Sequence, residues 1–174
     1  MTYFEFYNIT PSFLPDQKKV KQKFYELSRT YHPDFFVNEI EEKQQEILEL
    51  STYNNKAYQT LSNPNKLTEY VLCLNGEISE SEKYTLPQSF LLEMMDVNEA
   101  LMELEFEANT EAILAISTQV KEIEENLFAH QNVLFNNYEA TKEPNVLKEI
   151  KDNYYRKKYL LRIRESINKF ATRI

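Results

Sequence analysis

Apolar residues near the start of the chain recur at the spacing of an α-helix. Intervals of four, three and four positions separate Val20, Phe24, Leu27 and Tyr31. Such intervals place the four side chains on one face of a helix of about four turns. Asp16 directly precedes these positions and is a residue type that caps helix N-termini. The pattern therefore predicts an amphipathic helix that begins after Asp16.

Prolines divide the rest of this first region into further helices. Pro33 ends the first helix, because proline cannot donate a backbone hydrogen bond and keeps the preceding residue out of the helical conformation. A second helix is predicted over 39–61, and a short loop between the two makes them an antiparallel hairpin. We also expect a short helix within 3–9 and another over 67–74.

Three longer amphipathic helices are predicted in the second half of the chain. The first covers 89–108, the second begins at Asn109, and Pro144 suits the first turn of the third. Long amphipathic helices with short connections pack as an antiparallel bundle. The polar, acidic segment 76–88 contains Pro87 and is interpreted as a hinge.

Composition agrees with an all-α fold class. The 174 residues include only one glycine, which disfavours turn-rich β architectures and glycine-rich phosphate loops. The formal net charge is -8, which makes non-specific binding to nucleic acid improbable on electrostatic grounds. Charge is uneven: residues 77–143 carry 15 acidic and 3 basic side chains, whereas residues 144–174 carry 3 and 9. The acidic and basic segments could therefore face each other within one bundle.

Few residues are candidates for metal or covalent chemistry. Cys73 is the single cysteine, so it cannot form an internal disulfide, and its apolar surroundings in sequence predict a buried small side chain. Two histidines offer no zinc-ligand pattern, and we expect no metal, cofactor or catalytic group. His130 is expected to be a structural or surface residue of a long helix. No stretch has the length of a membrane span, and the first residues do not resemble a signal or transit peptide, so a cytoplasmic location is expected.

The tripeptide His32-Pro33-Asp34 is the most informative motif. It follows Tyr31, ends a helix rich in lysine and opens a hairpin near the amino terminus. Proline and aspartate are also ordinary turn residues, so the tripeptide alone would suit any helical hairpin. In this setting, however, residues 1–75 resemble the J domain of DnaJ-type co-chaperones. The resemblance implies that the tripeptide contacts a DnaK-type ATPase chaperone and stimulates its ATP hydrolysis.

The residue types at this loop suit contact with another protein. Asp34 offers a carboxylate that can accept two hydrogen bonds from an arginine. Pro33 stiffens the loop and so reduces the entropy lost on docking. Basic side chains on the preceding helix could steer it to an acidic chaperone surface, although they could equally form a solvated face. These candidates are Lys18, Lys19, Lys21, Lys23 and Arg29.

The helix predicted to begin at residue 89 is too apolar for a single core stripe. Phe90 and Met94 belong to the stripe assigned to the core, while other apolar residues project away from it and are followed by acidic ones. An apolar surface edged by carboxylates favours binding to a protein, although packing within the molecule would also explain it. We call this set the acid-edged patch: Leu91, Leu92, Met95, Asp96, Glu99 and Glu103. The last helix has two apolar stripes, one with Leu161 assigned to the core and one with Tyr159 that could extend the patch or serve the core.

Together these segments resemble the HscB family, the J-type co-chaperones of iron–sulfur cluster assembly. The similar segments include Leu67-Thr68-Glu69-Tyr70-Val71-Leu72, Asn75-Gly76 and Ser89-Phe90-Leu91-Leu92-Glu93-Met94-Met95, and the length also agrees. The resemblance implies an N-terminal J domain (1–75), a hinge (76–88) and a three-helix scaffold-binding domain (89–174). It further implies that the bundle binds the cluster scaffold protein IscU and delivers it to the chaperone HscA.

The same resemblance implies which residues hold the scaffold. They are the six residues of the acid-edged patch together with Tyr159. Asp96 and Tyr159 depart mildly from the family pattern, which has a longer acid and a phenylalanine at these positions. The expected organisation is bacterial and cytoplasmic, with neither nucleic acid nor membrane as a partner.

Two other classes of function fit parts of the sequence. One is a helical adaptor with a degenerate J domain, acting in oligomerisation or in general DnaJ-type chaperone recruitment. Chaperone binding would distinguish it from the first hypothesis. The other is a metal-dependent or hydrolytic enzyme that uses His32 and Asp34, for which the sequence offers no third ligand or nucleophile.

Overall fold

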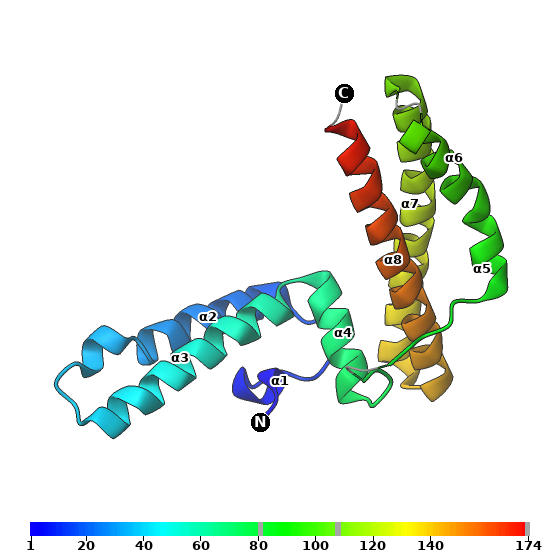
Figure 1. The fold of residues 1–174 in the computed structure, drawn as a ribbon. Helices are drawn as coiled ribbons and strands as arrows, with labels where there is room; N and C mark the ends of the chain where they lie inside the picture. Colours follow the sequence, from blue (N-terminus) through cyan, green and yellow to red (C-terminus); the bar gives the residue numbers. More distant parts are fainter. Residues whose placement is uncertain (80–81, 107–108, 173–174) are drawn as a thin grey trace. The chain divides into compact units, whose positions relative to one another are not determined.

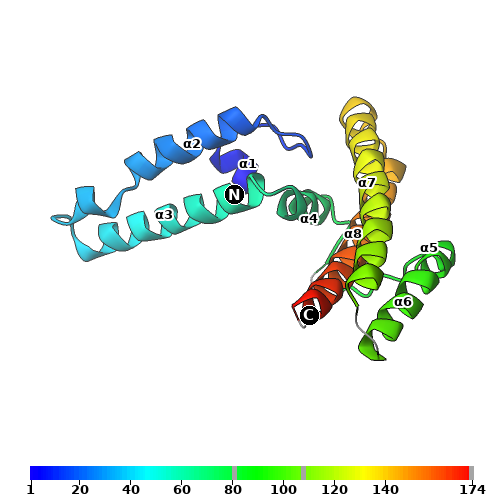
Figure 2. The same cartoon turned by 90° about the horizontal axis from the view of Figure 1, so that it is seen from above.

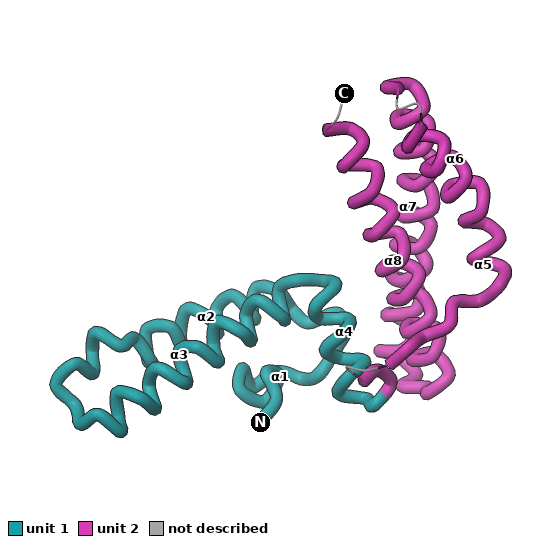
Figure 3. The backbone as a smooth tube through the Cα atoms, in the orientation of Figure 1, with its two compact units in different colours: residues 1–76 teal, residues 77–174 magenta. Residues whose placement is uncertain are grey.

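The structure is a computed structural model that describes residues 1–79, 82–106 and 109–172. Within these ranges every regular element is a helix, which confirms the predicted all-α class. The chain divides into two compact units, residues 1–76 and 77–174 (Figure 3). Gly76, at the end of the first unit, has a φ of 73°, a left-handed conformation that suits glycine.

The N-terminal unit is a hairpin of two helices with two smaller helices beside it. Helices α2 (Gln17–Thr30) and α3 (Glu41–Leu61) lie antiparallel along each other (Figures 1 and 2). The short helix α1 (Tyr3–Phe6) and α4 (Pro64–Leu74) complete the unit. A core of apolar side chains from these helices includes Phe4, Val20, Ala57, Leu61 and Leu72.

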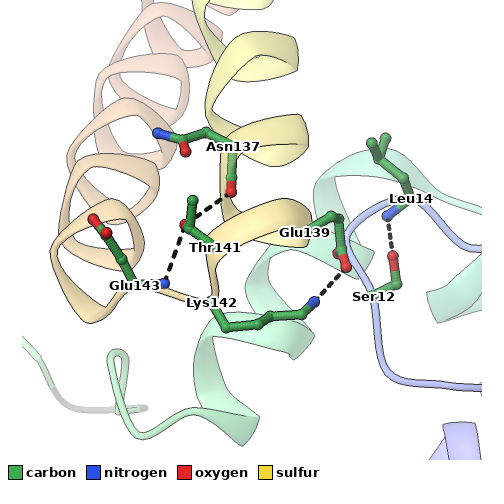
Figure 4. Close-up of polar contacts among 7 residues, drawn as sticks. All are labelled: Ser12, Leu14, Asn137, Glu139, Thr141, Lys142 and Glu143. Atoms are coloured by element: carbon green, nitrogen blue, oxygen red, sulfur yellow. Dashed lines mark hydrogen bonds and ion pairs between the residues drawn. The ribbon is translucent and has the colours of Figure 1, made fainter.

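Local capping chemistry sets where these helices begin. The Asp16 carboxylate accepts hydrogen bonds from the backbone N–H groups of Lys18 and Lys19, which confirms the predicted N-cap of α2. Just before it, Ser12 Oγ accepts a hydrogen bond of 2.9 Å from the Leu14 N–H (Figure 4). Asn63 caps α4 in the same manner as Asp16 caps α2.

The prediction for Cys73 was wrong, because this side chain is exposed. The buried side of α4 is formed by Leu67, Thr68, Val71 and Leu72. Each residue of an α-helix advances by about 100°, so Cys73 lies beyond the edge of that face. The apolar run Tyr70-Val71-Leu72-Cys73-Leu74 therefore includes residues from both the buried and the exposed face of this short helix.

The C-terminal unit is a bundle of three helical arms. The first arm consists of α5 (Gln88–Glu93) and α6 (Met95–Phe106), the second is α7 (Thr110–Thr141) and the third is α8 (Pro144–Ala171). Helices α7 and α8 lie antiparallel in both views (Figures 1 and 2). Asn109 caps α7, and Pro144 occupies the first turn of α8, as predicted.

The first arm is divided, whereas the sequence predicted one helix over 89–108. Met94 separates α5 from α6, and it is fully buried in the core. Hydrogen bonds of the α-helical type still cross the joint: the Met94 N–H donates to the Phe90 carbonyl at 3.0 Å, and the Asn98 N–H donates to the Met94 carbonyl at 2.9 Å. The predicted end of this helix at residue 108 lies outside the described residues.

A tight turn connects α7 to α8 (Figure 4). Lys142 ends α7 with a φ of 54° and donates its N–H to the Tyr138 carbonyl at 2.8 Å. The Thr141 hydroxyl donates to the Asn137 carbonyl at 2.9 Å and accepts from the Glu143 N–H at 3.3 Å. The Lys142 ammonium pairs with the Glu139 carboxylate of the same helix. These contacts close the C-terminal end of α7 and hold the turn that leads into α8.

The core stripe of α8 changes face along the helix, so the prediction that Leu161 is buried was wrong. Leu161 is exposed, whereas Leu160, Ile163 and Ile167 are buried. The reason is that the C-terminal half of α8 packs into a core shared with α5, α6 and α7. Of the two predicted stripes, the first is buried in the N-terminal half of α8 at Leu147, Ile150 and Tyr154, and the second is buried in the C-terminal half at Ile163 and Ile167.

Residues 77–87 precede α5 without regular structure among those described, and several of them are held against α8. Lys151 donates to the Glu77 carbonyl at 2.6 Å and pairs with the Glu82 carboxylate. The Tyr84 ring stacks on Tyr155 with centroids 4.4 Å apart, and its hydroxyl donates to Asp152 at 2.6 Å. In the described residues we find no helix with the length and apolar character needed to span a membrane.

Candidate functional sites on the two units

The tripeptide forms the first turn of a short 3-10 helix, Pro33–Phe36, after the end of α2. His32 has extended backbone angles, φ −74° and ψ 121°, as expected for a residue before proline. Its Nδ1 accepts a hydrogen bond from the Asp34 N–H at 3.3 Å. The imidazole therefore caps the turn that presents the aspartate, and the two side chains are held side by side.

This hydrogen bond has a chemical consequence for His32. A neutral imidazole that accepts a hydrogen bond at Nδ1 carries its proton on Nε2. The Nε2–H is then a donor, and the Asp34 carboxylate 3.8 Å from Nδ1 is an acceptor. His32 and Asp34 consequently offer a donor and an acceptor side by side, which suits recognition of a polar surface on another protein.

Both side chains are accessible to a partner. The His32 side chain is 50% exposed and the Asp34 side chain is 82% exposed. The described part of the chain contains no group of three or more potential ligands that could hold a metal ion. The exposure of both side chains favours contact with a macromolecule.

The return from the tripeptide to α3 is stabilised by Gln44, a residue that the sequence analysis did not single out. Its side-chain amide donates to the Val37 carbonyl at 3.1 Å and to the Glu39 carbonyl at 2.8 Å. One side chain of α3 thereby satisfies two carbonyl groups of the loop. This reduces the freedom of the loop and complements the stiffness contributed by Pro33.

A buried asparagine connects α2 to α3 and so sets the position of the loop. Asn54 of α3 is 1% exposed, and its amide nitrogen donates to the Phe24 carbonyl at 3.1 Å and to the Ser28 hydroxyl at 3.0 Å. Both acceptors belong to α2. The packing of α2 against α3 is therefore specified by directional hydrogen bonds as well as by apolar contact.

The basic candidates on α2 lie at its surface. Lys18, Lys19, Lys21 and Arg29 are exposed, whereas Lys23 is partly buried and forms an ion pair of 2.8 Å with Glu26. An exposed pair of this kind contributes little to stability. Most of the positive charge on α2 is thus open to solvent and accessible to an acidic partner.

Apolar residues next to the tripeptide are an additional feature that the sequence analysis missed. Phe35, Val37 and Ile40 are all exposed, and the Phe35 ring lies 5.5 Å from the His32 ring. The signal in the sequence is the run Phe35-Phe36-Val37, which follows a helix-ending proline and has no helical periodicity. A pocket of about 310 Å³ lies among these elements, lined by Pro33, Asp34, Phe36, Val37, Glu41, Gln44, Gln45, Ile47 and Leu48.

The acid-edged patch is exposed on the C-terminal unit. Leu91, Leu92 and Met95 all point away from the core, while Phe90 and Met94 are buried within it. Each of the three carboxylate residues of the patch is exposed as well. The helix therefore separates its apolar residues into a buried set and an exposed set, and the exposed set combines apolar surface with negative charge.

Tyr159 of α8 is placed differently from the other scaffold-binding candidates. It is partly buried and packs against the core of the unit. Its ring meets Phe90 edge to face at 5.7 Å, and its hydroxyl accepts a hydrogen bond from the Asn98 amide at 2.8 Å. Tyr159 thus lies beside the helix that carries the patch and helps to hold that helix in place.

The C-terminal unit matches a known protein family. Residues 86–168 match the family model described as the HSCB C-terminal oligomerisation domain. A co-chaperone protein HscB homolog of Shewanella denitrificans is 30% identical over 136 residues, which cover 78% of this chain and 75% of that protein. This chain belongs to the HscB family. The similarity to HscB reaches the N-terminal unit as well, because the 136 matched residues exceed the length of the C-terminal unit, 77–174.

Two further HscB proteins extend the comparison. The human iron-sulfur cluster co-chaperone protein HscB is 32% identical over 166 residues, which cover 95% of this chain and 66% of the human protein. The crystal structure of the human co-chaperone protein HscB matches with a TM-score of 0.74 at 29% identity, covering 100% of this chain and 84% of that one. The HscB fold is thus shared by both units, and these HscB relatives are co-chaperones by name.

Proposed function

We propose that this chain is a co-chaperone of iron–sulfur cluster assembly with a client site and a chaperone site on separate units. The acid-edged patch and Tyr159 hold an IscU-type scaffold protein. The tripeptide docks on a DnaK-type chaperone of the HscA class and stimulates its ATPase. The chain itself hydrolyses nothing and acts in the bacterial cytoplasm, with no nucleic acid or membrane as a partner.

The observation that carries this proposal is the exposed corner formed by His32 and Asp34. Its donor and acceptor are presented at the end of a basic helix, and the loop is braced by Pro33 and Gln44. A rigid polar feature of this kind loses little entropy when it docks on another protein. The basic side chains of α2 increase the rate of encounter with an acidic chaperone surface.

The proposal assigns a role to each part of the chain. The J domain is residues 1–75, the hinge is 76–88 and the scaffold-binding domain is 89–174. Because client and chaperone bind to one chain, their binding is coupled in the chaperone cycle, and ATP hydrolysis occurs when the client is delivered. In this arrangement the tripeptide affects the chaperone's rate of ATP hydrolysis, and the acid-edged patch affects the affinity for the scaffold protein.

The direct test measures the steady-state ATPase rate of an HscA-type chaperone with the full chain added. His32→Gln keeps a polar side chain but removes the imidazole, and it is expected to reduce stimulation roughly tenfold or more if the corner is an interface hot spot. His130→Gln is the matched control, because His130 is the other histidine and is exposed on α7. The control is expected to stimulate like the unmodified chain.

The outcomes separate the proposal from its rivals. Full stimulation by His32→Gln would contradict the chaperone site. Self-association of the unmodified chain without chaperone binding would favour a helical adaptor with a degenerate J domain. Turnover or bound metal in the isolated chain, lost in His32→Gln, would favour an enzyme.

A further inference from the structure

A row of exposed apolar side chains continues beyond the acid-edged patch towards the end of α6. Met102 is 62% exposed and Phe106 is 89% exposed. They follow Met95 along one line of α6, because intervals of seven and four residues return to nearly the same side of a helix. Neither residue belongs to the patch, and the core stripe on the other side of α6 does not use them.

The joint at Met94 falls between Leu91 and Met95. Hydrogen bonds of the α-helical type enter and leave Met94, and Leu91 and Met95 on its two sides are both exposed. Within α6, eleven residues separate Met95 from Phe106, a length of roughly 16 Å at 1.5 Å per residue. The apolar row therefore extends well beyond the two turns that contain Leu91, Leu92 and Met95.

The exposed row lies on the side of α6 away from the core. Val97, Leu101 and Leu104 are buried and supply the contacts of α6 with the core. Met102 and Phe106 lie on the opposite side, where large apolar side chains face water. A contiguous row of this kind marks an interaction surface more often than an isolated exposed residue does.

Carboxylates lie along both edges of the row. Glu99 and Glu103 lie on one side of it, and Glu105 lies on the other, and all three are exposed. Next to Met102 there is a pocket of about 480 Å³ between α6 and α8, lined by Asn98, Leu101, Met102, Glu105, Ser166, Lys169 and Phe170. A complementary partner would bring apolar side chains to the row and lysine or arginine to its edges.

We propose that the scaffold-binding surface extends along α6 through Met102 to Phe106. The scaffold protein covers this extension with an apolar segment whose edges are basic. This inference rests on the proposed function, since the row is continuous with the acid-edged patch and shares its acidic border. It adds Met102 and Phe106 to the proposed scaffold-binding surface and states that the partner's segment there is apolar with basic edges.

The test measures the affinity of the full chain for an IscU-type scaffold protein by titration calorimetry. The double variant Met102→Ala with Phe106→Ala is expected to weaken binding about tenfold or more, mainly through faster dissociation. Leu114→Ala with Phe128→Ala is the matched control, because these apolar residues are exposed on a different helix, α7. Helical content and melting temperature of both variants should match the unmodified chain.

A second comparison separates failure of this inference from failure of the proposed function. If the double variant binds normally while Leu91→Ala with Met95→Ala binds weakly, the extension is wrong and the patch remains. If neither variant weakens binding, the assignment of the whole client site is wrong. Equal weakening by the α7 control would also overturn the extension, because the effect would not depend on the row.

The other possible occupant of the exposed row is a second copy of the chain. Sedimentation velocity of the unmodified chain and of the double variant, both without scaffold, distinguishes this case. A dimer that is lost on changing Met102 and Phe106 would overturn the inference. A monomer in both samples, together with weakened scaffold binding, supports it.

Discussion

The Tyr7 hydroxyl donates a hydrogen bond of 2.9 Å to Oδ1 of Asn54 in the interior of the N-terminal unit. Tyr7 is fully buried, and the nitrogen of the same Asn54 amide donates to α2. One amide thus connects the segment after α1, helix α2 and helix α3. Since the tripeptide begins where α2 ends, this buried network helps to position the tripeptide.

Replacement of Asn54 tests that network. Asn54→Ala leaves the Tyr7 hydroxyl and the acceptors on α2 without this partner, and we expect a loss of about 2–3 kcal/mol in the free energy of unfolding of the N-terminal unit. Urea denaturation followed by circular dichroism measures the loss. Asn55→Ala is the control, because Asn55 is the exposed neighbour in α3, and a loss below about 0.5 kcal/mol is expected there. Equal effects of the two changes would contradict the role of the network.

The pH dependence of stability provides a second test. Burial raises the pKa of the Tyr7 phenol well above its ordinary value of 10.0. The unfolded chain therefore loses this proton first, so the contribution of Tyr7 to stability is complete below pH 10.0 and decreases as the pH rises beyond it. We expect the stability difference between the unmodified chain and Tyr7→Phe to shrink above that pH. A constant difference between pH 8 and 11, measured by urea denaturation, would contradict the raised pKa.

The apolar residues of the acid-edged patch are expected to contribute directly to scaffold affinity. Combined replacement of Leu91, Leu92 and Met95 by alanine should weaken scaffold binding by roughly 2 kcal/mol or more, about thirtyfold. The fold should be retained, because all three side chains are exposed. Calorimetric titration measures the affinity, and Leu161→Ala, at an exposed leucine of α8, is the control. Unchanged affinity of the triple variant would remove this residue assignment.

The positive charge of α2 is expected to act on the rate of association with the chaperone. Replacing Lys18, Lys21 and Arg29 by glutamate should slow association, and the effect should diminish as salt is raised from about 0.05 to 0.5 M. Lys23 is left unchanged because it already pairs with Glu26. Stopped-flow measurement gives the rates, with Lys66→Glu on α4 as a single-charge control. Equal slowing at both salt concentrations would argue against electrostatic steering.

Several exposed features could be predicted from sequence because they depend on few neighbours. Pro33 must end α2, and the exposed position of His32 and Asp34 follows from a short loop between antiparallel helices. The split between Met94 in the core and Met95 at the surface follows from helical periodicity alone. The same periodicity also contains Met102 and Phe106, which continue the exposed side of α6 beyond Met95.

Residues that depend on distant partners could not be predicted in this way. Nothing in the local sequence of Gln44 indicates that its amide satisfies two loop carbonyls. The bond between Asn98 and Tyr159 joins positions 61 residues apart. The division of the first arm at Met94 likewise required the structure, since the apolar pattern continues through it.

By itself, the sequence determined the all-α class, the starts of α2, α7 and α8 and the tripeptide in the loop of a hairpin. These features result from local physics: side-chain caps satisfy the first N–H groups of a helix, proline prevents its continuation, and periodicity defines its apolar face. Only the tertiary structure decided that Cys73 and Leu161 are exposed, that Asn54 links three segments and that Tyr159 supports the helix bearing the patch. The physical reason is that burial and directional hydrogen bonds depend on which neighbours pack against each face, and those neighbours are distant in sequence.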